Sequence, residues 1–77
     1  MSENEWLMFF SDSLLTIMER RRMSQRELAE RSGVSDGTIS KYINGIQIPK
    51  ITALANIALA LDCSIDELAQ FDEMIER

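Results

Sequence analysis

The chain has 77 residues, the length of one small domain. With a single cysteine and no histidine, it excludes an internal disulfide framework, the common zinc sites and histidine-based catalysis, so we expect no cofactor and no enzyme. We also expect a cytoplasmic protein without a membrane partner or a small-molecule ligand, because no apolar run could span a bilayer and the acidic N-terminal sequence is unlike a signal peptide.

The net charge of −5 argues at first against a nucleic-acid partner. The charge is unevenly distributed, however. Seven of the eight basic residues and three of the thirteen acidic residues lie in 20–50, which gives this segment a charge of +4. Acidic residues dominate the flanking segments 1–19 and 51–77. Since the local field governs what docks at a surface, the central segment can still meet an anionic partner.

Apolar residues at three- and four-residue steps predict a first helix from about residue 4 to residue 21. They are Trp6, Phe10, Leu14, Ile17 and Met18. Arginines occupy positions 20–22, in the last turn. We interpret them as a solvated helix end, where cations offset the helix dipole, in preference to a phosphate clamp.

A capping box predicts the start of a second helix, because Ser24 can cap an orphan N–H and Glu27 can reach back to the cap. Gly33 accepts a left-handed conformation and ends this helix. Two pairs at i,i+4 spacing account for the exposed charges without a functional role: Arg26 with Glu30, and Glu27 with Arg31.

A third short helix begins after the N-cap Ser35 and ends at Asn44-Gly45. Pro49 can then begin a fourth helix, at about 50–61. One stripe of that helix carries Ile51, Leu54, Ile57, Ala58 and Leu61.

Residues 64–67 form a second capping box and open a fifth helix, with Leu68 and Phe71 facing inward. No strand pattern or repeat is present. The sequence therefore predicts a single all-α domain over 1–77, a compact five-helix fold with a short acidic C-terminal tail.

The spacing between Gln25 and Tyr42 is more specific than that of a generic helical hairpin. Ala29 stands where two steeply crossing helices would meet, and Gly33 at the bend between them. A small wedge core would fill the angle, formed by Leu28, Val34, Ile39 and Tyr42. This pattern is typical of a DNA-binding helix-turn-helix.

The run from Ser24 to Leu68 resembles the Cro/repressor-type (XRE) helix-turn-helix family of transcription regulators. The resemblance rests on Glu-Leu-Ala, Gly-Val-Ser, Thr-Ile-Ser, Asn-Gly before a proline, and the closing Ile-Ala-x-Ala-Leu-x-x-Ser-x-x-Glu-Leu. With Leu14 and Ile17 it covers about residues 10–70, so the first helix carries an N-terminal extension. It implies the lambda-repressor-like fold, with the helix-turn-helix at the second and third helices.

The resemblance also implies the residues that contact double-stranded DNA. Gln25 would hydrogen-bond phosphate and sometimes a base edge, with Arg26 beside it. The exposed face of the recognition helix would enter the major groove, through Ser35, Asp36, Gly37, Thr38 and Lys41. Asn44 and the loop to Lys50 would follow the backbone and set the register.

Two of these residues have open roles. Lys41 can donate to guanine O6 and N7, or it can contact a phosphate from a solvated helix face. Asp36 can accept from cytosine N4, support Lys41, or act as a second cap; we favour capping or support.

The sequence departs from the family at a scaffold position. The family often pairs an arginine in the first helix with a glutamate before the Asn-Gly equivalent, and here Met18 and Ile43 stand there. An apolar contact in place of that ion pair leaves the fold intact.

A single unit contacts one half-site, so we expect a homodimer. Six apolar residues exceed the needs of a core of this size: Trp6, Phe9, Leu15, Leu59, Met74 and Ile75. They would either extend the core or form the dimer contact. For the dimer contact we favour the fifth helix and the tail. The leading hypothesis is a sequence-specific repressor that binds operator DNA. The alternative is a protein-interaction module on the same fold, such as an antitoxin or anti-repressor.

Overall fold

The structure, a computed structural model, describes residues 2–69, and within this range it consists of five α-helices. Helix α1 runs from Glu3 to Arg21. It begins after Ser2, whose hydroxyl accepts from the Glu5 N–H, and it ends at Arg22, which takes a left-handed conformation. The expected apolar positions of α1 are all buried, so one continuous stripe of this helix faces the core.

Helices α2 and α3 span Gln25–Ser32 and Asp36–Ile43. The hydroxyls of Ser24 and Ser35 cap them by accepting from the third backbone N–H of each helix. Gly33 joins the two helices with φ of +75°, a conformation that costs a residue with a Cβ about 1–2 kcal/mol. The predicted caps and the predicted glycine bend are therefore confirmed.

Helix α4 spans Ile51–Leu61, and α5 spans Ile65–Ala69 within the described residues. Pro49 does not begin α4: it is buried in the connection, and Lys50 is the N-cap in extended geometry. The predicted stripe of α4 is buried except for Ile51, which is 59% exposed because it begins the helix beyond the edge of the core. The expected inward position of Phe71 lies outside the described residues.

The two predicted capping boxes differ. Ser64 and Glu67 form both bonds, since the Ser64 hydroxyl accepts from the Glu67 N–H at 3.0 Å and the Ser64 N–H donates to Glu67 Oε1 at 3.3 Å. In the first box only the serine bond is present. The Glu27 carboxylate binds Arg31 instead, at 2.9 Å, so its expected return to the cap is wrong.

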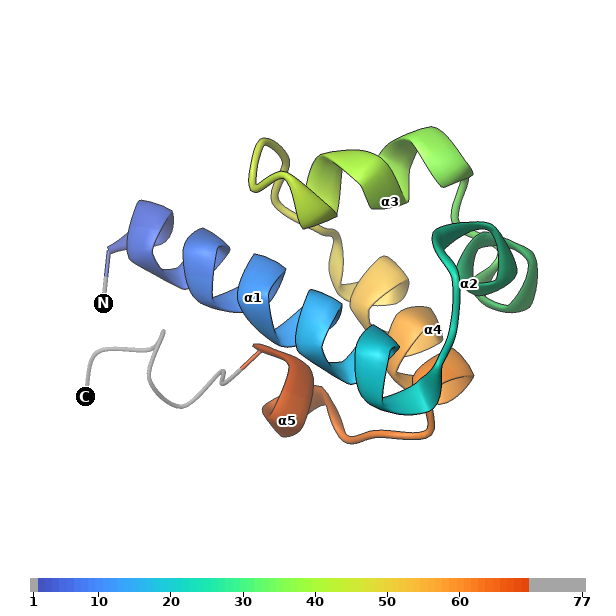
Figure 1. Cartoon of the computed structure of the whole chain (residues 1–77). Helices are drawn as coiled ribbons and strands as arrows, with labels where there is room; N and C mark the ends of the chain where they lie inside the picture. The colour runs from blue at the N-terminus through green and yellow to red at the C-terminus, as the bar shows by residue number, and fades with distance from the viewer. Residues whose placement is uncertain (1, 70–77) are drawn as a thin grey trace.

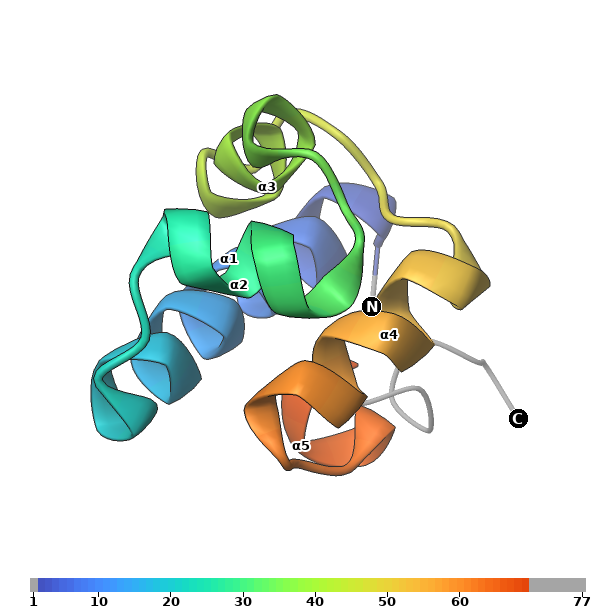
Figure 2. The same ribbon diagram turned by 90° about the vertical axis from the view of Figure 1, so that its right-hand side faces the viewer.

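The five helices enclose one apolar core. Helix α1 packs on α5, α2 packs on α4 and α3, and α3 also contacts α1. Figure 1 shows α1 as the long helix across the middle, with α2 and α3 toward one side of it and α5 on the other. In the view of Figure 2, α2 lies in front, with α3 above it and α4 beside it. Met18 and Ile43 both pack on this core, in keeping with an apolar substitute for the family ion pair.

Polar groups from distant parts of the chain close the core. The Trp6 indole N–H donates to the Ala69 carbonyl at 2.7 Å, which links α1 to α5. The Ser11 hydroxyl donates to the Tyr42 carbonyl at 2.7 Å, which links α1 to α3, and the Leu7 carbonyl lies within 2.9 Å of the same hydroxyl. Trp6 thus belongs to the core rather than to a dimer contact.

The arginine triplet is divided among three roles. Arg21 caps the C-terminus of α4 by donating to the carbonyls of Leu61 and Asp62, at 2.8 and 3.1 Å. Arg22 is the left-handed C-cap of α1, and Arg20 borders a surface pocket. No helix within residues 2–69 has the length and apolar character needed to cross a membrane.

Candidate nucleic-acid interface

Helix α3, the recognition helix that the family resemblance implies, presents its outer face to solvent. Ile39 and Tyr42 are buried beneath it, at 0% and 2% exposure. Because these residues fix the inward side, the opposite side of the helix carries Gly37 and Lys41, four residues apart and both exposed. Burial raises the pKa of Tyr42, which supports α3 from below as a neutral side chain.

The Ser35 and Thr38 side chains, at the start of α3, are hydrogen-bonded to each other. The Ser35 hydroxyl accepts from the Thr38 N–H at 3.2 Å and donates to Thr38 Oγ1 at 2.7 Å. Ser35 is therefore a cap rather than a free donor. The Thr38 hydroxyl keeps its own proton, since it accepts from Ser35, and so Thr38 can still donate to a ligand.

Two of the predicted DNA-contacting residues are joined directly. The Gln25 side-chain amide donates to the Asp36 carboxylate, with 3.0 Å between Nε2 and Oδ1, and to the Asp36 carbonyl at 3.1 Å. This contact brings together the N-terminal ends of α2 and α3. Asp36 is the first residue of α3, behind the cap Ser35, and within residues 2–69 it makes no ion pair with Lys41. Its observed partner is Gln25.

Gly37 has no steric reason to be glycine in the folded chain. A Cβ at this position would meet no heavy atom within 4 Å, and its φ lies outside the left-handed region. Gly45 is different, since its φ is +70° and a Cβ there would lie 3.3 Å from Ser11 Oγ. The fold thus explains Gly45 but leaves room for a side chain at Gly37.

The segment after α3 is exposed and mixed in character. The Asn44 side chain donates to the Ser40 carbonyl at 2.9 Å, so it secures the end of α3. Lys50 is exposed at the start of α4, while Ile46 and Ile48 are 70% and 40% exposed. Arg26 is the most accessible cation of α2, with a side chain 88% exposed and a loose 3.9 Å contact to Glu30.

The predicted site residues thus form a surface over α2, α3 and the following loop, with Lys50 at its far end. Ser40 was not singled out from the sequence. It lies half-buried on the outer side of α3, and its carbonyl holds Asn44. The four-residue spacing of Ser40 and Asn44 could have predicted this contact, because an asparagine side chain can donate to the carbonyl four residues before it.

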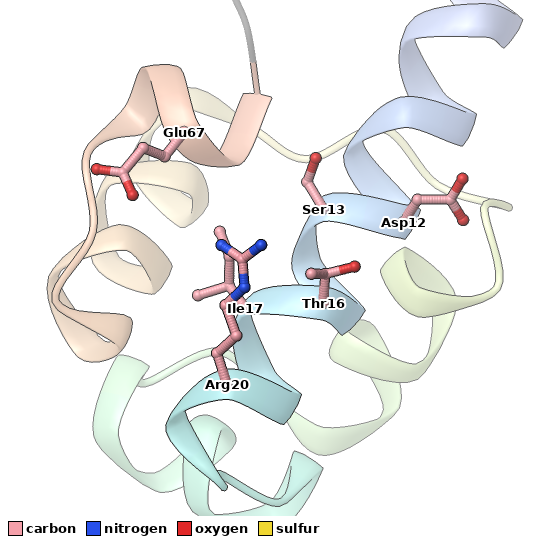
Figure 3. Close-up of a pocket in the computed structure, with 6 residues that line it drawn as sticks. All are labelled: Asp12, Ser13, Thr16, Ile17, Arg20 and Glu67. Carbon is pink, nitrogen blue, oxygen red and sulfur yellow. The ribbon is translucent and has the colours of Figure 1, made fainter.

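A pocket of about 310 Å³ lies elsewhere, between α1 and α5. Figure 3 shows Arg20 beside Ile17 on α1, with Glu67 across the pocket on α5. Asp12, Ser13 and Thr16 complete its lining. It contains no residue of the predicted interface.

Comparison with known proteins agrees with this arrangement. A helix-turn-helix family model matches residues 14–68, and the chain therefore belongs to this family, of the XRE type. Over 55 residues the chain is 38% identical to an uncharacterized HTH-type transcriptional regulator, y4dL, of Sinorhizobium fredii. That alignment covers 71% of this chain and 28% of the relative. No solved structure shows a significant match.

Proposed function

We propose that this protein is a sequence-specific transcriptional repressor that binds operator DNA as a homodimer, with α3 in the major groove. The observation that carries the proposal is the outer face of α3, where Gly37 has open space around it and Lys41 stands exposed one turn further along. A glycine that the fold does not require destabilises the helix, and glycine is the residue that suits a place where a ligand approaches the backbone closely.

The charge distribution supports the same face. The interface carries Arg26, Lys41 and Lys50, whereas most acidic residues lie in the flanking segments. Cations at this surface favour phosphate, and each phosphate neutralised makes log affinity fall by about 0.9 per unit of log salt. With few cations the non-specific affinity is low, so selectivity rests on base contacts and on the geometry of the dimer.

For the dimer contact we propose the outer face of α4. The fifth helix, which the sequence favoured for this contact, has little exposed apolar surface in its described part, because Leu68 and Ala69 of α5 are buried in the core. Met74 and Ile75, also expected there, lie outside the described residues. Helix α4 has no charged residue at all, and Ile51 and Leu59 on its surface are 59% and 79% exposed.

Charge also favours a second copy as the occupant of this face. Two copies of a chain with a net charge of −5 repel each other, and an uncharged helix lets them meet without opposing carboxylates. The same uncharged surface can be used by both copies in a two-fold contact. Two half-sites would then lie about 34 Å apart on the operator.

Selection of bound duplexes from a random pool tests the proposal. We expect a pseudo-palindromic site whose half-sites are one helical turn apart, and binding to random duplex with a shallow salt dependence. Lys41→Met should select a site in which the preference at one base pair of each half-site is relaxed, whereas Arg20→Met, beside the pocket of Figure 3, should select the same site as the wild type. A folded protein that binds no duplex at low salt would contradict the DNA function and favour a protein-interaction module.

A further inference from the structure

We infer that Gln25 and Asp36 together form an acceptor pair that selects a base carrying an exocyclic amino group, cytosine at N4 or adenine at N6, in the operator half-site. This inference rests on the proposed DNA-binding function. It assigns a recognition role to a side-chain pair that the fold brings together from two helices.

The orientation of the Gln25 amide follows from its neighbours. Its amide group lies 3.0 Å from Asp36 Oδ1 and 3.1 Å from the Asp36 carbonyl oxygen. Both of these atoms are acceptors, so only the NH₂ end of the amide can face them. The two acceptors match the two N–H bonds of that group. The side chain is left with the lone pairs of Oε1 and no donor to offer.

Asp36 has the same polarity. An ionised carboxylate only accepts hydrogen bonds, and Gln25 engages one of its two oxygens. The side chain is exposed in the first turn of α3, where the positive end of the helix dipole favours a carboxylate. Gly37 follows it, and with no Cβ it leaves the space beside the carboxylate open.

The partner must therefore donate. Phosphate oxygens are acceptors and negatively charged, so the side-chain pair disfavours them. In the major groove the hydrogen-bond donors of the base pairs are the amino groups of cytosine and adenine. Of the two partners expected for the Gln25 side chain, phosphate and a base edge, we therefore assign it the base edge, together with Asp36.

Base analogues test this assignment. Starting from the duplex that the wild-type protein selects, each cytosine or adenine in turn is replaced by its analogue without the exocyclic amino group. At one position per half-site we expect wild-type affinity to fall about tenfold or more. With Asp36→Ala, which removes both carboxylate oxygens and so the acceptors of this side chain, we expect that penalty to disappear. Gln25→Met should weaken the same penalty, since Asp36 loses its partner.

Asp66→Ala is the matched control, because Asp66 also stands in the first turn of a helix, α5, and the substitution makes the same change in charge. It should retain the full penalty for the missing amino group. Thermal melting establishes that each variant is folded, and the ratio of the two affinities cancels any uniform change in electrostatic attraction.

The outcomes are distinct. If Asp36→Ala tightens binding to all duplexes equally and the penalty for the missing amino group persists, the carboxylate only repels phosphate and the inference is overturned. Equal affinity of the wild-type protein for every analogue duplex overturns it as well, while leaving the DNA-binding function standing. If the folded wild-type protein binds no duplex at low salt, both the function and the inference fail.

Discussion

The carboxylate of Asp36 accepts a hydrogen bond from the side-chain amide of Gln25, with 3.0 Å between Oδ1 and Nε2. The two residues are eleven positions apart and begin different helices. Gly33 makes this meeting possible, since its left-handed conformation turns α3 back across α2. The helix-turn-helix therefore has a polar link at its open end, in addition to the apolar wedge around Leu28 and Ile39.

Gly37→Ala should separate stability from DNA binding. Because a Cβ at this position has open space, we expect alanine to stabilise the fold by roughly 0.5–1 kcal/mol, measured by urea denaturation. The same methyl group should weaken affinity for the selected duplex, since it stands between α3 and the groove. Gly33→Ala is the control: its φ of +75° makes alanine destabilising. Unchanged affinity in Gly37→Ala would contradict a close approach at this position.

Lys41 and Lys50 should differ in the kind of contact they make. Lys50→Met is expected to weaken binding to all sequences equally and to reduce the slope of log affinity against log salt by about one, as a lost phosphate contact does. Lys41→Met should instead lower the preference for one base pair by about 1–3 kcal/mol. Both measurements come from competition titrations over a range of salt. A uniform loss in Lys41→Met would assign Lys41 to a phosphate.

Ser11→Ala should destabilise the fold by about 1 kcal/mol, the net worth of one hydrogen bond, measured by urea denaturation. Ser11 is 8% exposed and donates to the carbonyl of Tyr42, and its removal leaves this carbonyl with the Gly45 N–H, at 3.2 Å, as its other donor. Ser13→Ala is a matched control on the same helix, because Ser13 makes no hydrogen bond among the described residues. An equal loss in the two variants would show that the link between α1 and α3 adds no stability.

Leu59→Glu should dissociate the proposed dimer. In a two-fold contact Leu59 of both copies would be buried, so the substitution would place two unpaired carboxylates in the apolar interface, at a cost in association free energy. We expect the dimer dissociation constant from sedimentation equilibrium to rise at least about tenfold. Leu15→Glu makes the same change on α1, where Leu15 is 43% exposed. A dimer weakened by Leu15→Glu and not by Leu59→Glu would place the contact on α1.

Cys63 should react slowly with alkylating reagents in the native protein. Burial, with the carboxylates of Glu67 and Asp62, raises the pKa of the thiol, and Arg21 opposes this shift. At pH 8 the thiolate fraction is then smaller in the folded than in the unfolded chain, so iodoacetamide should modify the native protein more slowly than the urea-unfolded one.

The same shift has a consequence for stability. A thiol whose pKa is raised by folding contributes stability below its unfolded pKa, and this contribution is lost as the pH rises through the folded pKa. Above about pH 8.5 the wild-type protein should therefore lose stability faster than Cys63→Ala. Tyr42, whose pKa burial also raises, adds an alkaline loss that both proteins share. Parallel pH profiles of the two proteins would contradict the shift at Cys63.

The helices and the turn between α2 and α3 could be predicted from the order of the amino acids. Caps such as Ser24 and Ser35 act within three residues of themselves, and the apolar stripe of α1 repeats within one helix. Such short-range interactions follow from neighbouring residues, whatever the rest of the chain does. The surface of α2 and α3 could be predicted for the same reason, since the spacing from Gln25 to Tyr42 defines how the two helices cross.

The contacts between groups that are distant in the chain could not be predicted in this way and became visible in the folded structure. It assigned Arg21 to the end of α4, Trp6 to the Ala69 carbonyl and Asp36 to Gln25. Each of these contacts joins two helices, and its geometry depends on how the whole core packs rather than on local spacing. Ile51 also could not be placed from the sequence. Its position in the apolar stripe of α4 predicted burial, but it lies beyond the edge of the core and is exposed. Periodicity identifies the face of a helix, but the packed partners decide how far along that face the core extends.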